Sequence, residues 1–302
     1  MATKSTAAKK ETKQKNTKQT RSQKVKADVS NEEIKENTAV EENENNEAMC
    51  EDKNTADAPK QDTPEQQVIL NEHSEEVCSM FKKITKHYDL LNHVCSLGLD
   101  YWWRHVLVNS FVPGPTNKIL DMAAGTLDVS LCALKKYKQA QIVAGDICPE
   151  MLEMGKEKLK ADNADRIELK TIDALAIPYA EKSFDVVSMA FGIRNIEERV
   201  KALTEMKKVL VIGGQLYILE FSPVKNPFLQ KAYYFYIEKI MPAIAKLFGE
   251  NAEAYEYLAK SIKAFPCQED FCAELKEAGF DFVNYRKLSF GIVTIYTAIK
   301  GK

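Results

Sequence analysis

The sequence predicts an α/β fold built on a seven-stranded, mostly parallel sheet, and two observations support this. Between residues 118 and 221, short runs of β-forming residues alternate with helical stretches, as in parallel strands joined by helices. Near the end of the chain, the runs 281–288 and 292–300 are separated only by SFG. A link that short joins antiparallel strands, because a parallel crossover needs about a dozen residues or more. We therefore expect one antiparallel strand, the last, in an otherwise parallel sheet.

The individual elements follow from hydrophobic spacing. Residues 67–116 are expected to form an N-terminal helical lid, because apolar side chains recur at helical spacing from Val77 to Leu91 and a second amphipathic helix begins at Trp102. Residues 225–265 are a predicted helical cap, and 270–279 a further helix. The expected strands are 118–123, 141–147, 166–174, 184–191, 213–221, 281–288 and 292–300, with helices at 129–137, 150–161 and 197–210.

Residues 1–66 are expected to be a disordered, charged tail that precedes a single domain at 67–302. Residues 1–26 carry nine Lys and Arg against one acid, and residues 27–66 carry thirteen acids against three lysines. With almost no large apolar side chains, such a segment cannot offset the entropy cost of ordering. The dense acids also argue against a transit peptide and against a basic arm that binds nucleic acid. We therefore expect no nucleic-acid partner.

Cysteine and histidine spacing gives no sign of a metal site or a disulfide framework. The seven cysteines contain no C-x-x-C pair, and the four histidines form no ligand-spaced set. The sequence also has no apolar stretch long enough to span a bilayer and no signal-peptide core. These observations favour reduced thiols and a cytoplasmic protein, with contact at the inner face of the membrane left open.

A ligand site is predicted at the carboxyl ends of the first three strands. ILDMAAGTLD (119–128) ends the first strand at Asp121 and enters a small-residue turn around Gly125, where a ligand can approach the backbone. Asp146 ends the second strand, where a carboxylate can accept both hydroxyls of an adenosine ribose. Asp173 and Ala174 end the third, offering an acceptor to the adenine amino group and room for its ring. Each acid alone could cap a helix, but three in register predict a ligand that contains adenosine.

This ligand is expected to lack phosphates. The loop has no G-x-x-x-x-G-K-[ST] motif, and Leu127 stands where a dinucleotide site needs a third glycine. Together with the antiparallel last strand, this favours S-adenosylmethionine and a Rossmann-like class I methyltransferase fold. The sulfonium of that cofactor makes its methyl group electrophilic, so an enzyme mainly has to align a nucleophile and exclude water.

Residues 77–300 resemble the ubiquinone/menaquinone biosynthesis C-methyltransferase family, which includes demethylmenaquinone methyltransferases. YDLLN, AFGIRN and LEFS are far more specific to this family than a generic methyltransferase loop. The main departure is Leu127, where the family usually has glycine in a G-T-G-D run, which predicts a cofactor loop of altered form. The segments that carry the resemblance include MFKKITKHYDLLNHVCSLGLDYWWR (80–104), ILDMAAGTLD (119–128), AFGIRNIEERVKAL (190–203), EMKKVLVIGGQLYILEFS (205–222) and YEYLAKSIKAFPCQE (255–269).

The resemblance implies transfer of a methyl group from S-adenosylmethionine to a ring carbon of a prenylated hydroquinone. Arg194, after the fourth strand, could hold a phenolate oxygen with its guanidinium; its alternative role is a salt bridge to an acid such as Glu197 or Glu220. Asn195 could orient the same hydroxyl. The cofactor-binding residues that we expect are Asp121, Gly125, Thr126, Asp146, Asp173 and Ala174.

Tyr88 and Asp89 are the other expected catalytic residues. Both belong to YDLLN, which in this fold would lie as a lid over the cofactor. The choice of general base among Asp89, Tyr88 and a water held by Arg194 stays open.

The expected substrate is demethylmenaquinol, in menaquinone biosynthesis. No convincing transit peptide precedes the domain, which favours a bacterial protein, for which this substrate is the commoner one. The alternative is ring methylation of a polyprenyl methoxy-benzoquinol in ubiquinone biosynthesis. Segment 225–248 suits either a buried cap or a wall for the prenyl tail with peripheral membrane contact, and a homodimer is left open.

Two rival functions remain at this point. A methyltransferase acting on nucleic acid or protein would favour a [DN]-P-P-[YF] clamp after the fourth strand, where this chain has AFGIRN. A non-catalytic, cofactor-binding scaffold of quinone synthesis is the second, and the retained acids and Arg194 argue against it.

Overall fold

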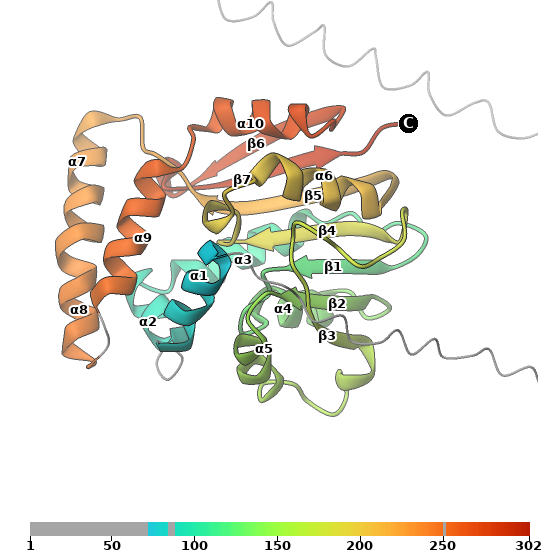
Figure 1. The fold of residues 1–302 in the computed structure, drawn as a ribbon, viewed down its shortest axis with the longest axis horizontal. Helices are drawn as coiled ribbons and strands as arrows, with labels where there is room; N and C mark the ends of the chain where they lie inside the picture. The colour runs from blue at the N-terminus through green and yellow to red at the C-terminus, as the bar shows by residue number, and fades with distance from the viewer. Residues whose placement is uncertain (1–71, 84–87, 250–251) are drawn as a thin grey trace, which may run out of the picture. The chain divides into compact units, whose positions relative to one another are not determined.

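The computed structural model describes residues 72–83, 88–249 and 252–302, and the tail predicted at 1–66 lies outside them. One seven-stranded sheet has the order β3-β2-β1-β4-β5-β7-β6 (Figure 1). Its strands are β1 (Lys118–Met122), β2 (Gln141–Asp146), β3 (Ile167–Thr171), β4 (Phe184–Ala190), β5 (Leu210–Phe221), β6 (Phe282–Leu288) and β7 (Val293–Ile299). β1 to β5 pair in parallel, and β7 pairs antiparallel with both β5 and β6. The predicted parallel sheet with an antiparallel last strand is confirmed.

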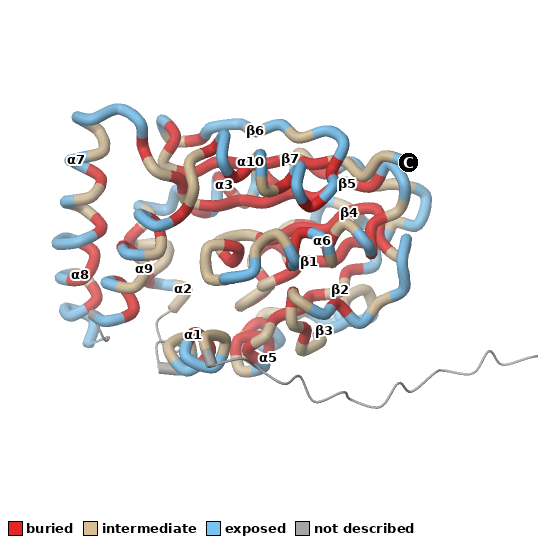
Figure 2. Tube along the Cα trace, turned by 45° about the horizontal axis from the view of Figure 1, so that its top comes forward, coloured by how far each residue is buried: buried red, intermediate tan, exposed pale blue. Residues whose placement is uncertain are grey.

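Burial along the strands explains why this order forms. β4, FDVVSMA, is buried at six consecutive positions, as expected of a central strand covered on both faces. β6 lies at one edge and carries exposed Arg286 and Lys287, which discourage pairing of that edge with another chain. Figure 2 shows the buried positions concentrated along the central strands.

Two helical layers cover the sheet. On one face, α3 (Leu99–Ser110) and α4 (Asp128–Lys136) pack on Ile119, Val186 and Leu219, with α5 (Pro149–Lys156) beside them over β2 and β3. On the other face, α6 (Arg199–Val209) and α10 (Gln268–Glu277) enclose a core that includes Leu120 and Ile218. Short 3-10 turns lie at η2 (Ala164–Arg166), η3 (Ile193–Asn195) and η5 (Ser289–Gly291).

A third group of helices gathers beyond the carboxyl ends of the parallel strands (Figure 1). It contains α1 (Glu72–Lys83), α2 (Tyr88–Cys95), α7 (Pro227–Phe235), the π-helical turn η4 (Tyr236–Ile240), α8 (Met241–Leu247) and α9 (Ala252–Ala264). Helices α2, α7, α8 and α9 share their own apolar core, with Leu91, Ile237 and Ile262 at its centre. These helices cover the edge of the sheet at which the sequence predicts the ligand.

The π-helical turn separates α7 from α8 at a proline. Pro242 has no N–H, and its ring would clash with the carbonyl four residues earlier. The preceding N–H, of Met241, accordingly donates to the carbonyl of Tyr236, five residues back. The predicted cap is therefore a set of helices with an interrupted first element, not one continuous helix.

The predicted N-terminal lid divides into parts with different positions. Helix α1 runs to Lys83 and α2 starts at Tyr88, and residues 84–87 between them lie outside the described part of the chain. Helix α3, also assigned to the lid, packs on the sheet through Trp103, Leu107 and Val108. Hydrophobic spacing identifies an amphipathic helix but does not tell against which apolar surface of the protein the helix packs.

Candidate active site

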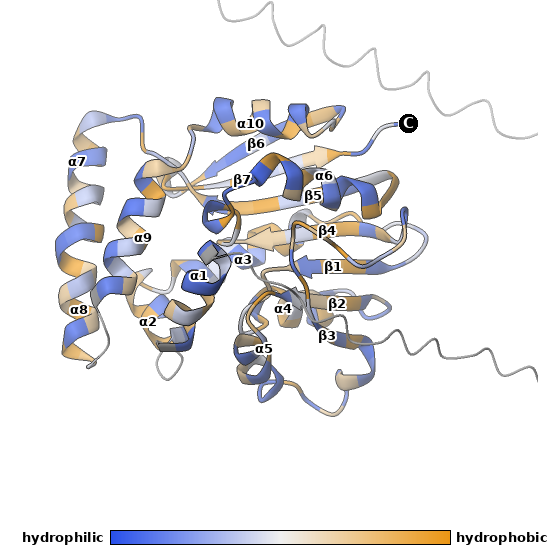
Figure 3. Ribbon diagram, in the orientation of Figure 1, coloured by the Kyte–Doolittle hydropathy of each residue, from blue (hydrophilic) through white to orange (hydrophobic). Residues whose placement is uncertain are grey.

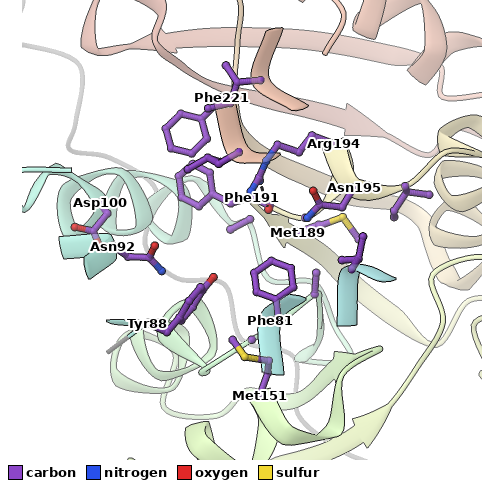
Figure 4. Close-up of a pocket in the computed structure, with 18 of the residues that line it drawn as sticks. Phe81, Tyr88, Asn92, Asp100, Met151, Met189, Phe191, Arg194, Asn195 and Phe221 are labelled. Atoms are coloured by element: carbon purple, nitrogen blue, oxygen red, sulfur yellow. Dashed lines mark hydrogen bonds between the residues drawn. The ribbon is translucent and has the colours of Figure 1, made fainter. Parts of the chain in front are cut away.

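A cavity of about 490 Å³ opens at the carboxyl ends of β1, β2 and β4 and extends under α1, α2, α7 and α9. Ligands of open α/β sheets bind where the strand order reverses, which is here between β1 and β4. Figure 4 shows Tyr88 and Asn92 on one side of the cavity and Arg194 and Asn195 on the other, with aromatic rings between them. Nine of the ten predicted site residues line it: Tyr88, Asp121, Gly125, Thr126, Asp146, Asp173, Ala174, Arg194 and Asn195.

Asp146 is hydrogen-bonded to the loop after β1. The Asp146 carboxylate accepts the N–H of Gly125 at 2.8 Å and that of Cys148 at 2.9 Å. A carboxylate has about four acceptor positions, so two remain for a ligand. Gly125 has φ +52°, and a Cβ at this position would meet only the Met151 Cε, at 3.9 Å. The space beside the loop is thus open, and with the remaining acceptor positions of Asp146 it fits an adenosyl group.

Leu127 keeps the loop in the conformation for which glycine would be the usual residue. Its φ of +68° is left-handed, which costs a non-glycine residue roughly 1–2 kcal/mol. The side chain is fully buried and packs with Ala144 and Leu152. A Cβ on Gly155 would lie 2.4 Å from the Leu127 Cγ, so the glycine in α5 makes room for this leucine. The leucine that stands in place of the usual glycine is therefore accommodated by packing below the loop.

The end of β3 presents Asp173 and Ala174 to the same cavity. One carboxylate oxygen of Asp173 accepts the N–H of Leu175 at 2.9 Å, and Oδ2 has no partner within the described part of the chain. Ala174 is buried and has no side chain beyond Cβ. This pair can offer an acceptor next to a flat space, as a purine ring requires.

Asp121 lies deeper than the other strand-end acids. It is 1% exposed, and its oxygens accept hydroxyl protons from Ser130 at 2.6 Å and Ser188 at 2.8 Å. Burial raises the pKa of Asp121 to about 6, although both serines oppose the shift. These contacts tie β1 to α4 and β4, so Asp121 is engaged within the protein beneath the loop, and its contact with a cofactor stays a prediction.

The raised pKa of Asp121 predicts a measurable pH dependence of stability. The folded-state pKa exceeds the unfolded one, so the folded chain binds more protons between about pH 4 and 6, and stability falls as the pH rises through this window. An Asp121→Asn variant lacks this titration. We expect the unfolding free energy of the wild type, minus that of the variant, to fall by about 2 kcal/mol from pH 4.5 to 7.5. Denaturant unfolding of both proteins measures this, and parallel pH curves would contradict it.

Asp89 lies outside the set of residues that line the cavity. Its carboxylate accepts the hydroxyl of Thr126 at 2.6 Å and forms an ion pair with Lys158, which also contacts Asp128 at 3.1 Å. Asp89 thus fastens α2 to the cofactor loop. This geometry favours a positioning role for Asp89 over the expected catalytic one. The hydroxyl of Thr126 donates to Asp89 of α2.

Arg194 combines the two roles that the sequence left open. Its guanidinium donates to the carboxylate of Glu220 at 3.1 Å and to the carbonyl of Phe191, while the residue lines the cavity. Glu220 is fully buried and also accepts the N–H of Phe221 at 2.8 Å. Burial raises the pKa of Glu220, and Arg194 opposes this shift. The ion pair holds the guanidinium in place without removing it from the cavity.

Hydroxyl and amide groups complete this side of the cavity. Burial raises the pKa of Tyr88, with a hydrogen bond from Asn92 acting in the opposite direction. Tyr88 therefore stays protonated and acts as a donor, not as a base, near neutral pH. The side-chain oxygen of Asn195 accepts the hydroxyl of Tyr257 at 3.3 Å, which links η3 to α9.

Sequence reasoning missed several residues of the site. Glu220 was considered only as a partner for Arg194, although an acid within the apolar LEFS segment signals a buried charge that needs one. Tyr233 and Tyr257 line the cavity from the cap helices. Only their place in an aromatic-rich region suggested them, because sequence spacing does not tell which tyrosines face a cavity.

The prediction of no disulfide is wrong for one pair. Cys78 of α1 is bonded to Cys148, just after β2, with Cα atoms 5.5 Å apart. The two cysteines are separated by 70 residues and form no motif, so only the packing of α1 against α5 reveals them.

Within the described residues, no helix has the length and apolar character to cross a membrane. No His, Cys, Asp and Glu cluster suited to a metal ion occurs in that same part of the chain.

Comparison with known proteins identifies the family to which most of the chain belongs. The model of the ubiE/COQ5 methyltransferase family matches residues 69–300. The chain is 40% identical over 233 residues to the ubiquinone/menaquinone biosynthesis C-methyltransferase UbiE of Geotalea daltonii, covering 76% of this chain and 99% of that protein. It is 37% identical over 228 residues to the demethylmenaquinone methyltransferase of Bacteroides fragilis, covering 75% and 93%.

A solved structure supports the fold independently. A SAM-dependent methyltransferase of Thermotoga maritima, described as a possible histamine N-methyltransferase, aligns with a TM-score of 0.53 at 17% identity. The alignment covers 74% of this chain and 98% of that one. At this identity the likeness concerns the fold alone.

Proposed function

Because this chain belongs to the ubiE/COQ5 methyltransferase family and is an S-adenosylmethionine-dependent C-methyltransferase, we propose that its substrate is demethylmenaquinol. The product would be menaquinol, methylated at a ring carbon. Relatives are named both for ubiquinone/menaquinone synthesis and for demethylmenaquinone. Methylation of a polyprenyl methoxy-benzoquinol is therefore the alternative that the test below separates.

One observation carries this proposal: a single cavity joins the adenosyl-binding strand ends to an apolar chamber, with Arg194 between them. Asp146, Asp173 and the open space beside Gly125 would hold the adenosyl part of the cofactor. Phe81, Phe191 and other apolar side chains form a wall suited to a flat ring.

The residues of the chain account for the chemistry expected of the site. When bound, the cofactor supplies an electrophilic methyl group. A ring carbon becomes a good nucleophile once the neighbouring hydroxyl gives its proton to a base, for which we propose a water molecule held by Arg194, since Tyr88 stays protonated and Asp89 lies outside the cavity. The Arg194 guanidinium stabilises the oxyanion that results. The carbon that gains the methyl group then loses its hydrogen as a proton, which restores the aromatic ring. Helices α1, α2 and α9 exclude water from this step.

An apolar route from the chamber to the surface suits a prenyl tail. Leu229, Ile237 and Met241 line the cavity from the cap. Leu97 and Leu99 line it as well and are 81% and 42% exposed, so they lie at its rim. Figure 3 shows the apolar positions along α7 and α8.

The outer side of the cap is suited to a lipid surface, where we propose that the protein takes up its substrate. The apolar residues Phe228, Phe235 and Leu247 are exposed on α7 and α8, among exposed lysines. Aromatic and aliphatic side chains flanked by lysines are typical of interfacial helices. These exposed residues support the proposal that this surface makes the membrane contact that the sequence left open.

An assay with pure protein tests the substrate. The full chain is mixed with S-adenosylmethionine carrying a labelled methyl group and, in detergent micelles, with demethylmenaquinol or the methoxy-benzoquinol. We expect labelled menaquinol, identified by mass, and slower or no labelling of the benzoquinol. The oxidised quinone should remain unlabelled because it has no hydroxyl proton to lose. Labelling of the benzoquinol alone would favour the alternative, and labelling of neither would refute the proposed function.

A further inference from the structure

Two residues that line the cavity each carry a buried polar atom with no hydrogen-bond partner among the described residues. These atoms are the Nε of Arg194 and the hydroxyl of Tyr233. Among the described residues, the other unpartnered buried side-chain atoms belong to Glu150, Tyr179 and Gln268, none of which lines this cavity. A buried donor without an acceptor costs about 1–3 kcal/mol. Two such donors at one cavity indicate that a ligand supplies the missing acceptor.

Tyr233 comes from α7 and is held by packing, not by hydrogen bonds. The residue is 8% exposed and belongs to the cluster that contains Leu91, Ile237 and Met241. Phe221 packs against the same cluster, and its ring centre lies 5.9 Å from the Arg194 guanidinium carbon. Phe221 therefore contacts both Arg194 and the apolar cluster to which Tyr233 belongs.

The charge pattern around Tyr233 keeps its hydroxyl a donor. Burial raises the pKa of Tyr233 well above its ordinary value, while Arg194 and Glu220 act on it in opposite directions. The Tyr233 hydroxyl is therefore protonated at any physiological pH. Glu220, the acid that acts on it, already accepts from the Arg194 side chain, the Arg194 backbone and the Phe221 backbone. The described part of the chain thus provides no acceptor for the Tyr233 proton.

We infer that Tyr233 is a substrate-binding residue, whose O–H and the Nε–H of Arg194 together donate to one oxygen of the substrate ring. This inference rests on the proposed function. The oxygen concerned is the one that becomes a phenolate when the neighbouring carbon accepts the methyl group. Two donors directed at one developing negative charge stabilise it more than a single guanidinium can. Tyr233 thereby sets the position of the ring as well as the acidity of its hydroxyl.

A matched pair of tyrosine variants tests this role. Tyr233→Phe removes the hydroxyl and keeps the ring. Tyr234→Phe does the same at the next residue, which does not line the cavity and whose ring contacts Lys263. For Tyr233→Phe we expect kcat/KM for the quinol to fall about tenfold to a hundredfold. The affinity for S-adenosylhomocysteine, measured by calorimetry, should stay unchanged, and Tyr234→Phe should match the wild type in both measurements.

Two further measurements separate this role from a structural one. Tyr233→Phe should melt at or slightly above the wild-type temperature, because it deletes a buried hydroxyl that has no partner in the folded protein. The apparent pKa on the acidic limb of its pH–kcat profile should rise, because the phenolate of the bound quinol loses one of its donors. Tyr234→Phe should change neither the melting temperature nor this apparent pKa.

Each result has a definite meaning. If the wild type methylates the quinol and both tyrosine variants do so equally, the role of Tyr233 is refuted and the proposed function stands. A lowered melting temperature of Tyr233→Phe with an unshifted pH profile also refutes it, in favour of a structural role. If the wild type methylates neither quinol, the proposed function and the role of Tyr233 both fail.

Discussion

Replacing Asp146 with asparagine is expected to weaken the binding of S-adenosylmethionine about a hundredfold or more. The Asp146 carboxylate accepts the N–H groups of Gly125 and Cys148 and retains acceptor positions for two ribose hydroxyls. An asparagine has one acceptor oxygen, and an NH2 group with two hydrogens replaces the second oxygen. It therefore loses at least one hydrogen bond to the ribose, and its NH2 group faces one of the two backbone N–H groups. Hydrogen bonds to a charged group contribute about 1.5–3 kcal/mol each, and 2.7 kcal/mol corresponds to roughly a hundredfold. Calorimetric titration with S-adenosylhomocysteine measures the effect without turnover.

Asp185→Asn is the matched control. Asp185 is also a buried strand aspartate, and it accepts backbone and hydroxyl protons from Thr116 and Lys118 near the start of β4, away from the cavity. Its replacement should lower stability and leave cofactor affinity near normal. Equal affinity of the Asp146 variant and the wild type would remove Asp146 from the cofactor site.

Loss of Arg194 is expected to lower kcat about a hundredfold to a thousandfold while cofactor binding stays near normal. Removal of a single oxyanion donor typically has an effect of this size. The simple Arg194→Ala variant also leaves Glu220 buried without its counter-ion, which costs about 3–5 kcal/mol and endangers the fold. We therefore expect the double variant Arg194→Gln, Glu220→Gln to be the more stable protein and to show the same loss of turnover. Single-turnover kinetics in both variants measures the methyl-transfer step directly.

Arg199 and Glu274 provide the control for this pair. They form a second, partly buried ion pair, with distances of 2.8 and 2.7 Å, between α6 and α10. Neither residue lines the cavity. The double variant Arg199→Gln, Glu274→Gln should retain wild-type turnover, and full activity of the Arg194 variants would show that this arginine takes no part in the chemistry.

The fold could be predicted from the sequence because its determinants are local. Alternation of strand-like and helical runs, and the three-residue link before Ile292, are visible along the chain and are confirmed by the sheet order. Asp146 and Asp173 could be placed because the ends of parallel strands meet at one edge of a sheet whatever the details of packing. The cavity brings these two acids together with Arg194.

The remaining features depend on contacts between distant segments. The ion pair of Asp89 with Lys158 and the bond between Cys78 and Cys148 join parts of the chain far apart in sequence. Nothing in the spacing of these residues distinguishes them from ordinary surface or core positions. The same holds for α3, which has the pattern of a lid helix but packs on the sheet.

The packing of Leu127 against Gly155 makes these two positions interdependent during evolution. A change of Leu127 to glycine would relieve the left-handed backbone, by roughly 1–2 kcal/mol, but would empty a leucine-sized space in the core, at about 2–5 kcal/mol. Any larger residue at 155 would collide with the leucine that is already there. A lineage that acquired this loop can therefore return to the glycine-rich version only by passing through a less stable intermediate or by altering both sites at once.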